Sequence, residues 1–343
     1  MSRTPNTPEK RDERKIVLIL PRQHGFFSLV FQAVGQAYLA EKDGTVPVVY
    51  FNRHCLYWSE EGFNGARNVW EYYFEPLSEI KVEDLFPVGR SELEDSSLDH
   101  FTKLSSGTNI TVTKRYPPVI EYKSPIGICL ERGFVNKLLR KYLIVKPHIR
   151  NKVDEYCRDH FHGHPFLGVH YRGIEKAHGK ETDSILSRKE GDMRHVYLRQ
   201  MKRYLDKHPK ARVFVATDSV QFLEEAKAAF GDAVCALEAT RLETADEIKG
   251  LHFSDHAKSK GALLGEEVLL DALILAKANF FIHGISSVSN AALFLNPRMK
   301  HIDIEIVHGR TAVYVRREFY RLMGRLSPTA ARQVERLEAF IRF

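Results

Sequence analysis

The apolar residues of this chain form two series in which short continuous runs alternate with helical spacing. The first series opens with an apolar run at residues 16–20, then places Val30, Val34 and Ala37 at helical spacing, and returns to an apolar run at residues 47–51. Continuous runs are typical of strands that are buried on both faces. A strand, a helix and a second strand in under about forty residues predict a βαβ unit with parallel strands.

The segment at residues 60–125 has a different character. Aromatic clusters around Trp70 and Phe86 are followed by a polar stretch at residues 91–106. This pattern predicts loops and short helices, with one edge strand. A further helix is expected to begin at Pro147 and to end the first domain, because proline fits the first turn of a helix.

A second series begins after residue 165 and predicts a second parallel sheet. Its strands are expected at residues 166–170, 213–216, 233–237, 280–283 and 302–306, and its helices around residues 197–204, 222–230, 264–275 and 288–294. We therefore predict an α/β protein with two Rossmann-like, doubly wound parallel sheets that face a cleft. The expected boundaries are a disordered leader at residues 1–14, a first domain at 15–160 and a second at 161–343, which ends in helices.

Composition narrows the class of protein. Hydrophobic residues make up 43% of the 343 and charged residues 28%, which excludes a disordered chain or a coiled coil. The net charge of +7 is compatible with an anionic ligand, and no apolar stretch approaches the length of about 20 residues that a membrane span needs. The four cysteines are dispersed and the N-terminus lacks a signal peptide's apolar core, so a cytoplasmic location is expected.

Charged and hydroxyl residues gather where predicted strands of the second domain end. The first of these strands runs into His170-Tyr171-Arg172-Gly173-Ile174-Glu175-Lys176. Arg172 and Lys176 suit a phosphate or pyrophosphate, unless the loop is only a solvated charged turn. Ser286 and Ser287 follow a later strand and open a helix, where backbone N–H groups form either an anion site or a plain capped terminus.

Two acidic residues belong to the same region. Asp218 follows the strand at 213–216, where Asp218 or Ser219 could instead cap the next helix. Asp271 interrupts an apolar helix face and could pair with donor groups of a nucleobase, or be a partly exposed acid near Lys277. Ligands of open α/β sheets bind beyond the carboxyl ends of the strands, so these residues are expected to line one site.

Together these motifs resemble the α1,6-fucosyltransferase superfamily, which includes nodulation and core fucosyltransferases. The resemblance is carried by the run from His170 to Lys176, by Ala216-Thr217-Asp218, by Leu270-Asp271 and by Ile285-Ser286-Ser287-Val288-Ser289. Gly25-Phe26-Phe27-Ser28, preceded by His24, resembles the family's first glycine loop. Residues 68–76 resemble a segment of bacterial relatives, and the match is strongest over residues 160–305.

The resemblance implies the GT-B architecture and the transfer of fucose from GDP-fucose, with inversion and without a metal ion or other cofactor. The first domain would then shape the acceptor site, and the second would bind the nucleotide sugar. By motif position, His170 and Asp271 would contact guanine, and Arg172 and Ser287 would hold the β-phosphate. The expected nucleotide-sugar site is completed by His24, Gly25, Phe26, Asp218 and Ser286.

The catalytic residues expected from the resemblance are Arg172, Glu175, Lys176 and Glu181. Glu175 and Lys176 match a required acid–lysine pair in which Asp is usual in place of Glu, and Gly173 stands where core fucosyltransferases have a second arginine. The chemistry agrees, because Arg172, Lys176 and a helix N-terminus can stabilise the charge that builds on a leaving β-phosphate. Inversion also needs a base for the acceptor hydroxyl, for which Glu181 is the first candidate and Glu71 the second.

Two other clusters could bind metal. His160, His162 and His164 would share one face of a strand, but a linker between the domains is the preferred interpretation. Asp303 and Glu305 would share a face of a predicted strand, and a metal role is not expected there.

The expected partners are a GDP-sugar donor and a glycan or other hydroxyl acceptor. No nucleic acid is expected, because the sequence has no RRM, KH or zinc-finger signature, and no integral membrane span is expected. A protein of the same fold that binds a nucleotide sugar without transferring it, or an enzyme that uses another sugar nucleotide, is the alternative. The sequence does not predict the oligomeric state.

Overall fold

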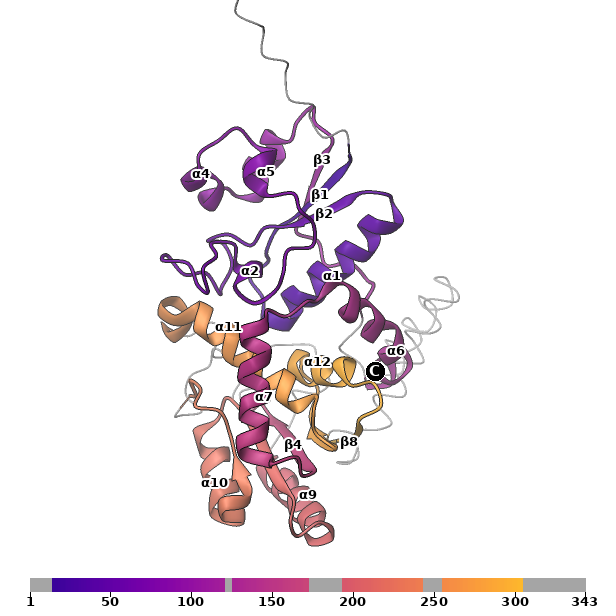
Figure 1. The fold of residues 1–343 in the computed structure, drawn as a ribbon, viewed down its shortest axis with the longest axis vertical. Coiled ribbons are helices and arrows are strands. Elements are labelled where there is room, and N and C mark those ends of the chain that lie inside the picture. The colour runs from indigo at the N-terminus through magenta and orange to yellow at the C-terminus, as the bar shows by residue number, and fades with distance from the viewer. Residues whose placement is uncertain (1–13, 121–124, 173–192, 243–254, 305–343) are drawn as a thin grey trace, which may run out of the picture.

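The computed structural model describes residues 14–120, 125–172, 193–242 and 255–304. Figure 1 shows two α/β halves arranged along the long axis of the molecule, with the first half at the top and helices that run between the halves. The expected leader at residues 1–14 lies almost wholly outside the described residues. Within the described parts of the chain, no helix is both long and apolar enough to cross a bilayer.

The first half contains a three-stranded parallel sheet with strand order β2-β1-β3. The apolar run at residues 16–20 forms the central strand, β1 (Ile16–Ile19), which pairs in parallel with β2 (Val46–Val49) and β3 (Ile110–Thr113). Helix α1 (Phe26–Lys42) connects β1 to β2. The predicted βαβ unit is therefore confirmed.

The irregular segment that follows β2 contains loops and four short helices. These are α2 (Val69–Tyr73), α3 (Val82–Leu85), α4 (Arg90–Asp95) and α5 (Leu98–Leu104). The segment also supplies β3, which lies at one edge of the sheet. Short helices and an edge strand are what the aromatic and polar clusters predicted.

The second half contains a five-stranded parallel sheet with strand order β6-β5-β4-β7-β8. Its strands are β4 (Phe166–Tyr171), β5 (Arg212–Thr217), β6 (Val234–Cys235), β7 (Phe280–His283) and β8 (Lys300–Asp303). Its helices are α9 (Arg194–Lys207), α10 (Val220–Phe230), α11 (Asp255–Leu275) and α12 (Ser287–Leu295), with a 3₁₀ turn at Gly231–Ala233. Every strand predicted for this half is present, with ends that differ by up to three residues.

Two helices join the halves. α6 (Pro125–Tyr142), which the sequence did not predict, packs against α12 and α1, while α7 (Pro147–Phe161) begins at Pro147 as expected and packs against α11. His160 lies within α7 and stacks on Tyr156, and His162 ends the helix in a left-handed conformation. The premise that the three histidines share a face of a strand is therefore wrong, because the apolar spacing of residues 149–161 continues the helix.

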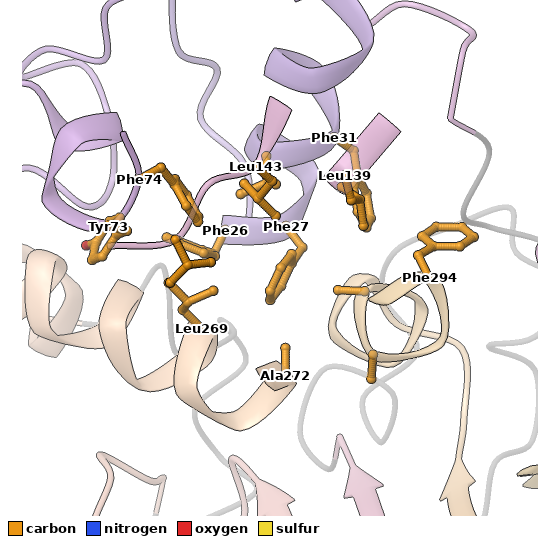
Figure 2. Close-up of a cluster of buried hydrophobic side chains, with 14 of the residues drawn as sticks. Phe26, Phe27, Phe31, Tyr73, Phe74, Leu139, Leu143, Leu269, Ala272 and Phe294 are labelled. Carbon is orange, nitrogen blue, oxygen red and sulfur yellow. The ribbon is translucent and has the colours of Figure 1, made fainter. Parts of the chain in front are cut away.

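A shared apolar core holds the two halves together. Figure 2 shows Phe26, Phe27 and Phe31 of α1 directed toward α11 and α12 of the second half. The rings of Phe31 and Phe294 meet edge to face, with centroids 5.6 Å apart. These contacts fix the position of the loop after β1 relative to the strand ends of the second sheet.

The approach of α11 to the first half depends on a glycine. The Tyr73 hydroxyl donates to the carbonyl oxygen of Ala262 over 2.7 Å. A Cβ at Gly265 would lie 2.3 Å from the Tyr73 hydroxyl oxygen, so no larger residue fits there without movement of the aromatic ring. The absence of a side chain at Gly265 lets α2 and α11 pack closely.

Candidate functional site

A cleft opens where the loops after β1, β4 and β5 face α11 and the start of α12. Its empty volume is about 860 Å³, including the part that is open to solvent. Its lining includes predicted site residues from both halves of the chain, namely Gly25, Phe26, His170, Arg172, Asp218, Asp271 and Ser287. The structure thus brings together residues separated by more than 200 positions in the sequence.

The first half contributes a compact, mostly apolar wall. Gly25 precedes α1, and a Cβ added to it would meet nothing within 4 Å, so the space above this residue is open. Phe26 is buried behind it and contacts Tyr57 and Tyr73 edge to face. His24 is exposed, with Nδ1 2.5 Å from the carbonyl oxygen of Gln23, and does not line the cleft.

His170 lies at the end of β4 and is held by α12. Its Nδ1 is 2.9 Å from the Ser289 hydroxyl and 3.3 Å from that of Ser286. Ser286 caps α12, because its hydroxyl oxygen accepts a hydrogen bond from the Ser289 backbone N–H. Ser286 therefore fixes the helix end and the His170 ring, while Ser287 lines the cleft at the N-terminus of α12, where the helix dipole favours an anion.

The strand ends β4 and β5 place Arg172 and Asp218 in the same cleft. Arg172 is half-buried and is the last residue described before the gap at 173–192. The hydroxyl of Ser219 accepts from the Phe222 backbone N–H and caps α10, so the helix cap is Ser219 and Asp218 is left to line the cleft. The predicted catalytic residues Glu175, Lys176 and Glu181 lie outside the described residues.

One face of α11 supplies a pair of acids. Asp271 and Glu267 lie one helical turn apart and both line the cleft. Burial raises the pKa of Asp271 to about 7, with Arg241 opposing this rise and Glu267 adding to it. Burial also raises the pKa of Glu267, although the Thr240 backbone N–H donates to its carboxylate over 3.1 Å.

Glu267 was not among the predicted site residues. The sequence contains a signal for it, because Leu264, Val268 and Asp271 recur with it on one face of α11 and all line the cleft. Asp271 was predicted because it interrupts this apolar face, and the same spacing predicts Glu267, which lies four residues earlier.

Glu71 lies elsewhere. Its carboxylate accepts from the Asn68 side chain over 2.8 Å and lines a second cleft, together with Lys81 and Lys146. The two clefts share no lining residue. The structure therefore does not bring Glu71 to the cleft that contains Asp271.

The other predicted acid pair is only partly described. Asp303 is buried at the end of β8, while Glu305 lies outside the described residues. Across the residues whose positions are described, no three His, Cys, Asp or Glu side chains form a group that could hold a metal ion.

Comparison with known proteins identifies the family. The family model of nodulation protein Z (NodZ) matches residues 128–318, which is more than half of the chain. A NodZ α-1,6-fucosyltransferase structure soaked with GDP-fucose aligns at 18% identity over 84% of this chain and 94% of that one, with a TM-score of 0.51. The fucosyltransferase NodZ from Bradyrhizobium aligns at 19% identity over 86% and 97%, with a TM-score of 0.51.

A more distant fucosyltransferase shares the fold. POFUT1 in complex with GDP aligns at 11% identity over 85% of this chain and 99% of that one, with a TM-score of 0.54. The predicted α/β class with two parallel sheets and GT-B architecture is confirmed. The chain belongs to the NodZ family and is a glycosyltransferase of the fucosyltransferase type.

Proposed function

We propose that this protein transfers fucose from GDP-fucose to a hydroxyl group of a glycan or another acceptor, with inversion and without a metal ion. The observation that carries the proposal is the cleft that combines a half-buried acid, Asp271, with the cation Arg172 and a helix N-terminus at Ser287. The relatives support the choice of donor, since one NodZ structure was soaked with GDP-fucose and POFUT1 binds GDP.

Asp271 is suited to recognise guanine. Its carboxylate can accept two hydrogen bonds, from the N1–H and the exocyclic amine of the base, and adenine and uracil do not present that pair of donors. An acceptor that the bound ligand covers but leaves without donors costs about 1–3 kcal/mol, so the site selects the base that satisfies it. His170, which the two serine hydroxyls hold in place, borders the same cleft.

Arg172 and the start of α12 are suited to hold the diphosphate. The Arg172 guanidinium can form two parallel hydrogen bonds to phosphate oxygens. Ser287 lines the cleft at the N-terminus of α12, where the first backbone N–H groups have no acceptor within the helix. In the transfer step, the acceptor oxygen forms a bond to the anomeric carbon as the bond to the β-phosphate oxygen breaks. Both groups then stabilise the negative charge on the departing GDP.

The proton of the acceptor hydroxyl needs a base. Glu181 is proposed for this role, and Glu175 with Lys176 for the acid–lysine pair that assists departure, on the resemblance of their positions. Gly25, Phe26 and Tyr57 give the first half one wall of the cleft, which supports an acceptor domain at residues 15–160 and a donor domain at 161–343. The dispersed cysteines support a cytoplasmic location.

The decisive experiment compares GDP and UDP by calorimetry in the wild type, Asp271→Asn and the control Asp206→Asn. Asp206 is an exposed acid on α9 that pairs with Lys202, away from the cleft. We expect the wild type and the control to prefer GDP, and Asp271→Asn to lose most of that preference. An undiminished preference in Asp271→Asn would contradict the assignment of guanine to this residue.

Transfer is then tested separately from binding. Purified protein incubated with GDP-fucose and no acceptor should release GDP and free fucose slowly, because water replaces the acceptor. GDP binding without any release from GDP-fucose, with or without a panel of glycans, would support the non-catalytic alternative. Release from another sugar nucleotide in preference to GDP-fucose would correct the donor.

A further inference from the structure

A chain of hydrogen bonds runs from α6 to the loop that precedes α12. Arg132 on α6 donates to Nε2 of His301 on β8, and Nδ1 of His301 lies 2.8 Å from Nε2 of His283 on β7. Nδ1 of His283 lies 3.1 Å from the carbonyl oxygen of Gly284. The two imidazoles stack with centroids 5.0 Å apart, and His283 is only 1% exposed.

The chemistry of the groups fixes the direction of every bond in this relay. Arginine only donates, so Nε2 of His301 accepts and its proton is on Nδ1. That proton is donated to Nε2 of His283, whose own proton is then on Nδ1 and is donated to Gly284. Burial lowers the pKa of His301 to about 4 and that of His283 well below its usual value, so both rings are neutral at pH 7.

The relay ends beside the cleft that contains Asp271 and Ser287. Gly284 lies two residues before Ser286, the cap of α12, and three before Ser287, which lines the cleft. The same helix α6 also holds the far end of α12, because the Asn136 side chain donates to the carbonyl oxygens of Phe294 and Leu295 over 2.7 and 3.1 Å. A helix that begins in the first half of the chain thus holds both ends of α12.

We propose that Arg132, His301 and His283 are positioning residues that fix the loop before α12, so that Ser287 and the helix N-terminus meet the donor's diphosphate. Only the last step rests on the proposed function, since the hydrogen-bond directions follow from the relay itself. Loss of the Arg132 donor frees His301 to place its proton on Nε2, and the Gly284 carbonyl then loses its fixed partner.

The tautomers are measured by ¹H–¹⁵N imidazole correlation spectra of the full chain labelled at histidine, with signals assigned through His283→Gln and His301→Gln. In the wild type both rings should carry the proton on Nδ1. In Arg132→Met, His301 should move toward the Nε2–H form and GDP affinity should fall about 10-fold, the size of effect expected for a residue outside the site. Arg132→Lys keeps a donor and should recover part of the affinity.

Asn136→Leu is the matched control, because Asn136 lies one turn further along α6 and binds α12 without touching the relay. It should lower the melting temperature but leave both tautomers and the GDP affinity within about twofold of the wild type. An Nε2–H tautomer at either histidine in the wild type would overturn the relay.

The positioning role has its own tests. It would be overturned by unchanged GDP affinity in folded Arg132→Met, or by an equal loss of affinity in Asn136→Leu. If the wild type itself fails to bind GDP, the proposed function is wrong, and the wild-type tautomers still decide whether the relay exists.

Discussion

The two sheets of this molecule are both parallel, yet their strand ends carry different chemistry. In the five-stranded sheet, His170 lies near the end of β4, while Arg172 and Asp218 directly follow β4 and β5, and all three line the cleft. In the three-stranded sheet, the central strand leads into Gly25 and Phe26, which bring open space and apolar surface. The second half therefore supplies the charged groups of the cleft, and the first supplies apolar surface and open space.

The two halves also contribute differently to the apolar core that they share. α1 of the first half contributes buried phenylalanines to a core completed by α11 and α12, the two helices that also border the cleft. The same helices face both the core and the cleft. If the cleft binds GDP as proposed, variants should separate into those that change stability and those that change GDP binding. The following predictions test that separation.

The largest effect is expected at the shared core. Phe31→Ala should destabilise the protein by about 3–5 kcal/mol, because its fully buried ring packs on Phe294 and truncation leaves a cavity between the halves. Denaturant unfolding measures the loss. Phe134→Ala is the control, since that ring is 42% exposed and its removal should cost far less. Equal losses in the two variants would mean that the halves do not depend on this core.

A smaller effect is expected in the second half, where the substitution of Arg172 should change ligand binding and not stability. Arg172→Ala should weaken GDP binding by about 1.5–3 kcal/mol, because it removes a charge-assisted contact to phosphate, and should leave the unfolding free energy nearly unchanged. Arg203→Ala, an exposed arginine on α9, should change neither quantity. Calorimetry checks both variants, and wild-type affinity in folded Arg172→Ala would remove Arg172 from the site.

The second half was also the easier one to predict. A fully buried parallel strand such as β4 appears in the sequence as a continuous apolar run, and such runs located every strand of this sheet. The residues at the strand ends could then be assigned to one edge without knowledge of the structure, and the cleft brings most of them together. Only the structure identifies Ser286 and Ser219 as the helix caps. In the sequence, neighbouring hydroxyl and acidic residues are equally good candidates for a cap.

The first half was harder for two physical reasons. α2 is so short and so fully buried at Trp70, Tyr72 and Tyr73 that it shows no helical periodicity. α6 carries Arg132 and Asn136 on its buried side, where they bind backbone and histidine partners of the second half. Polar residues on a buried face break the apolar pattern from which a helix is predicted, and only the tertiary structure shows what satisfies them.

A third prediction concerns the pH dependence of the ligand site. Asp271 must be ionised to accept from guanine, and burial raises its pKa to about 7. GDP affinity should therefore be constant above about pH 8 and fall below pH 7, approaching a tenfold loss for each further unit, or about 1.4 kcal/mol. Calorimetry across pH 5.5–8.5 measures the profile. A flat profile would mean that Asp271 binds the donor in one protonation state throughout or is not in contact with the base.

Asp271 also links the ligand site to stability, with the opposite sign. A carboxyl whose folded pKa lies above its unfolded value binds more protons when folded, so stability falls as pH rises from about 4 to 7. Asp271→Asn should remove this dependence and raise the melting temperature at pH 8 while it weakens GDP binding. A lower melting temperature at pH 8 would show that Asp271 stabilises the empty site, contrary to the expected conflict between stability and binding.

The smallest effect is expected from metal removal. If Arg172 and the N-terminus of α12 stabilise the departing diphosphate, no divalent cation is needed for that charge, and GDP-fucose turnover should be the same with and without EDTA. Turnover is measured as GDP release after dialysis against the chelator, with an added excess of Mg²⁺ or Mn²⁺ in a parallel sample. Loss of activity that Mn²⁺ restores would contradict the proposal. A metal ion would then stabilise the charge of the leaving group. Such an ion binds carboxylate oxygens, so the first residues to test as its ligands would be Asp303 and the acids of the cleft, Asp218 and Glu267.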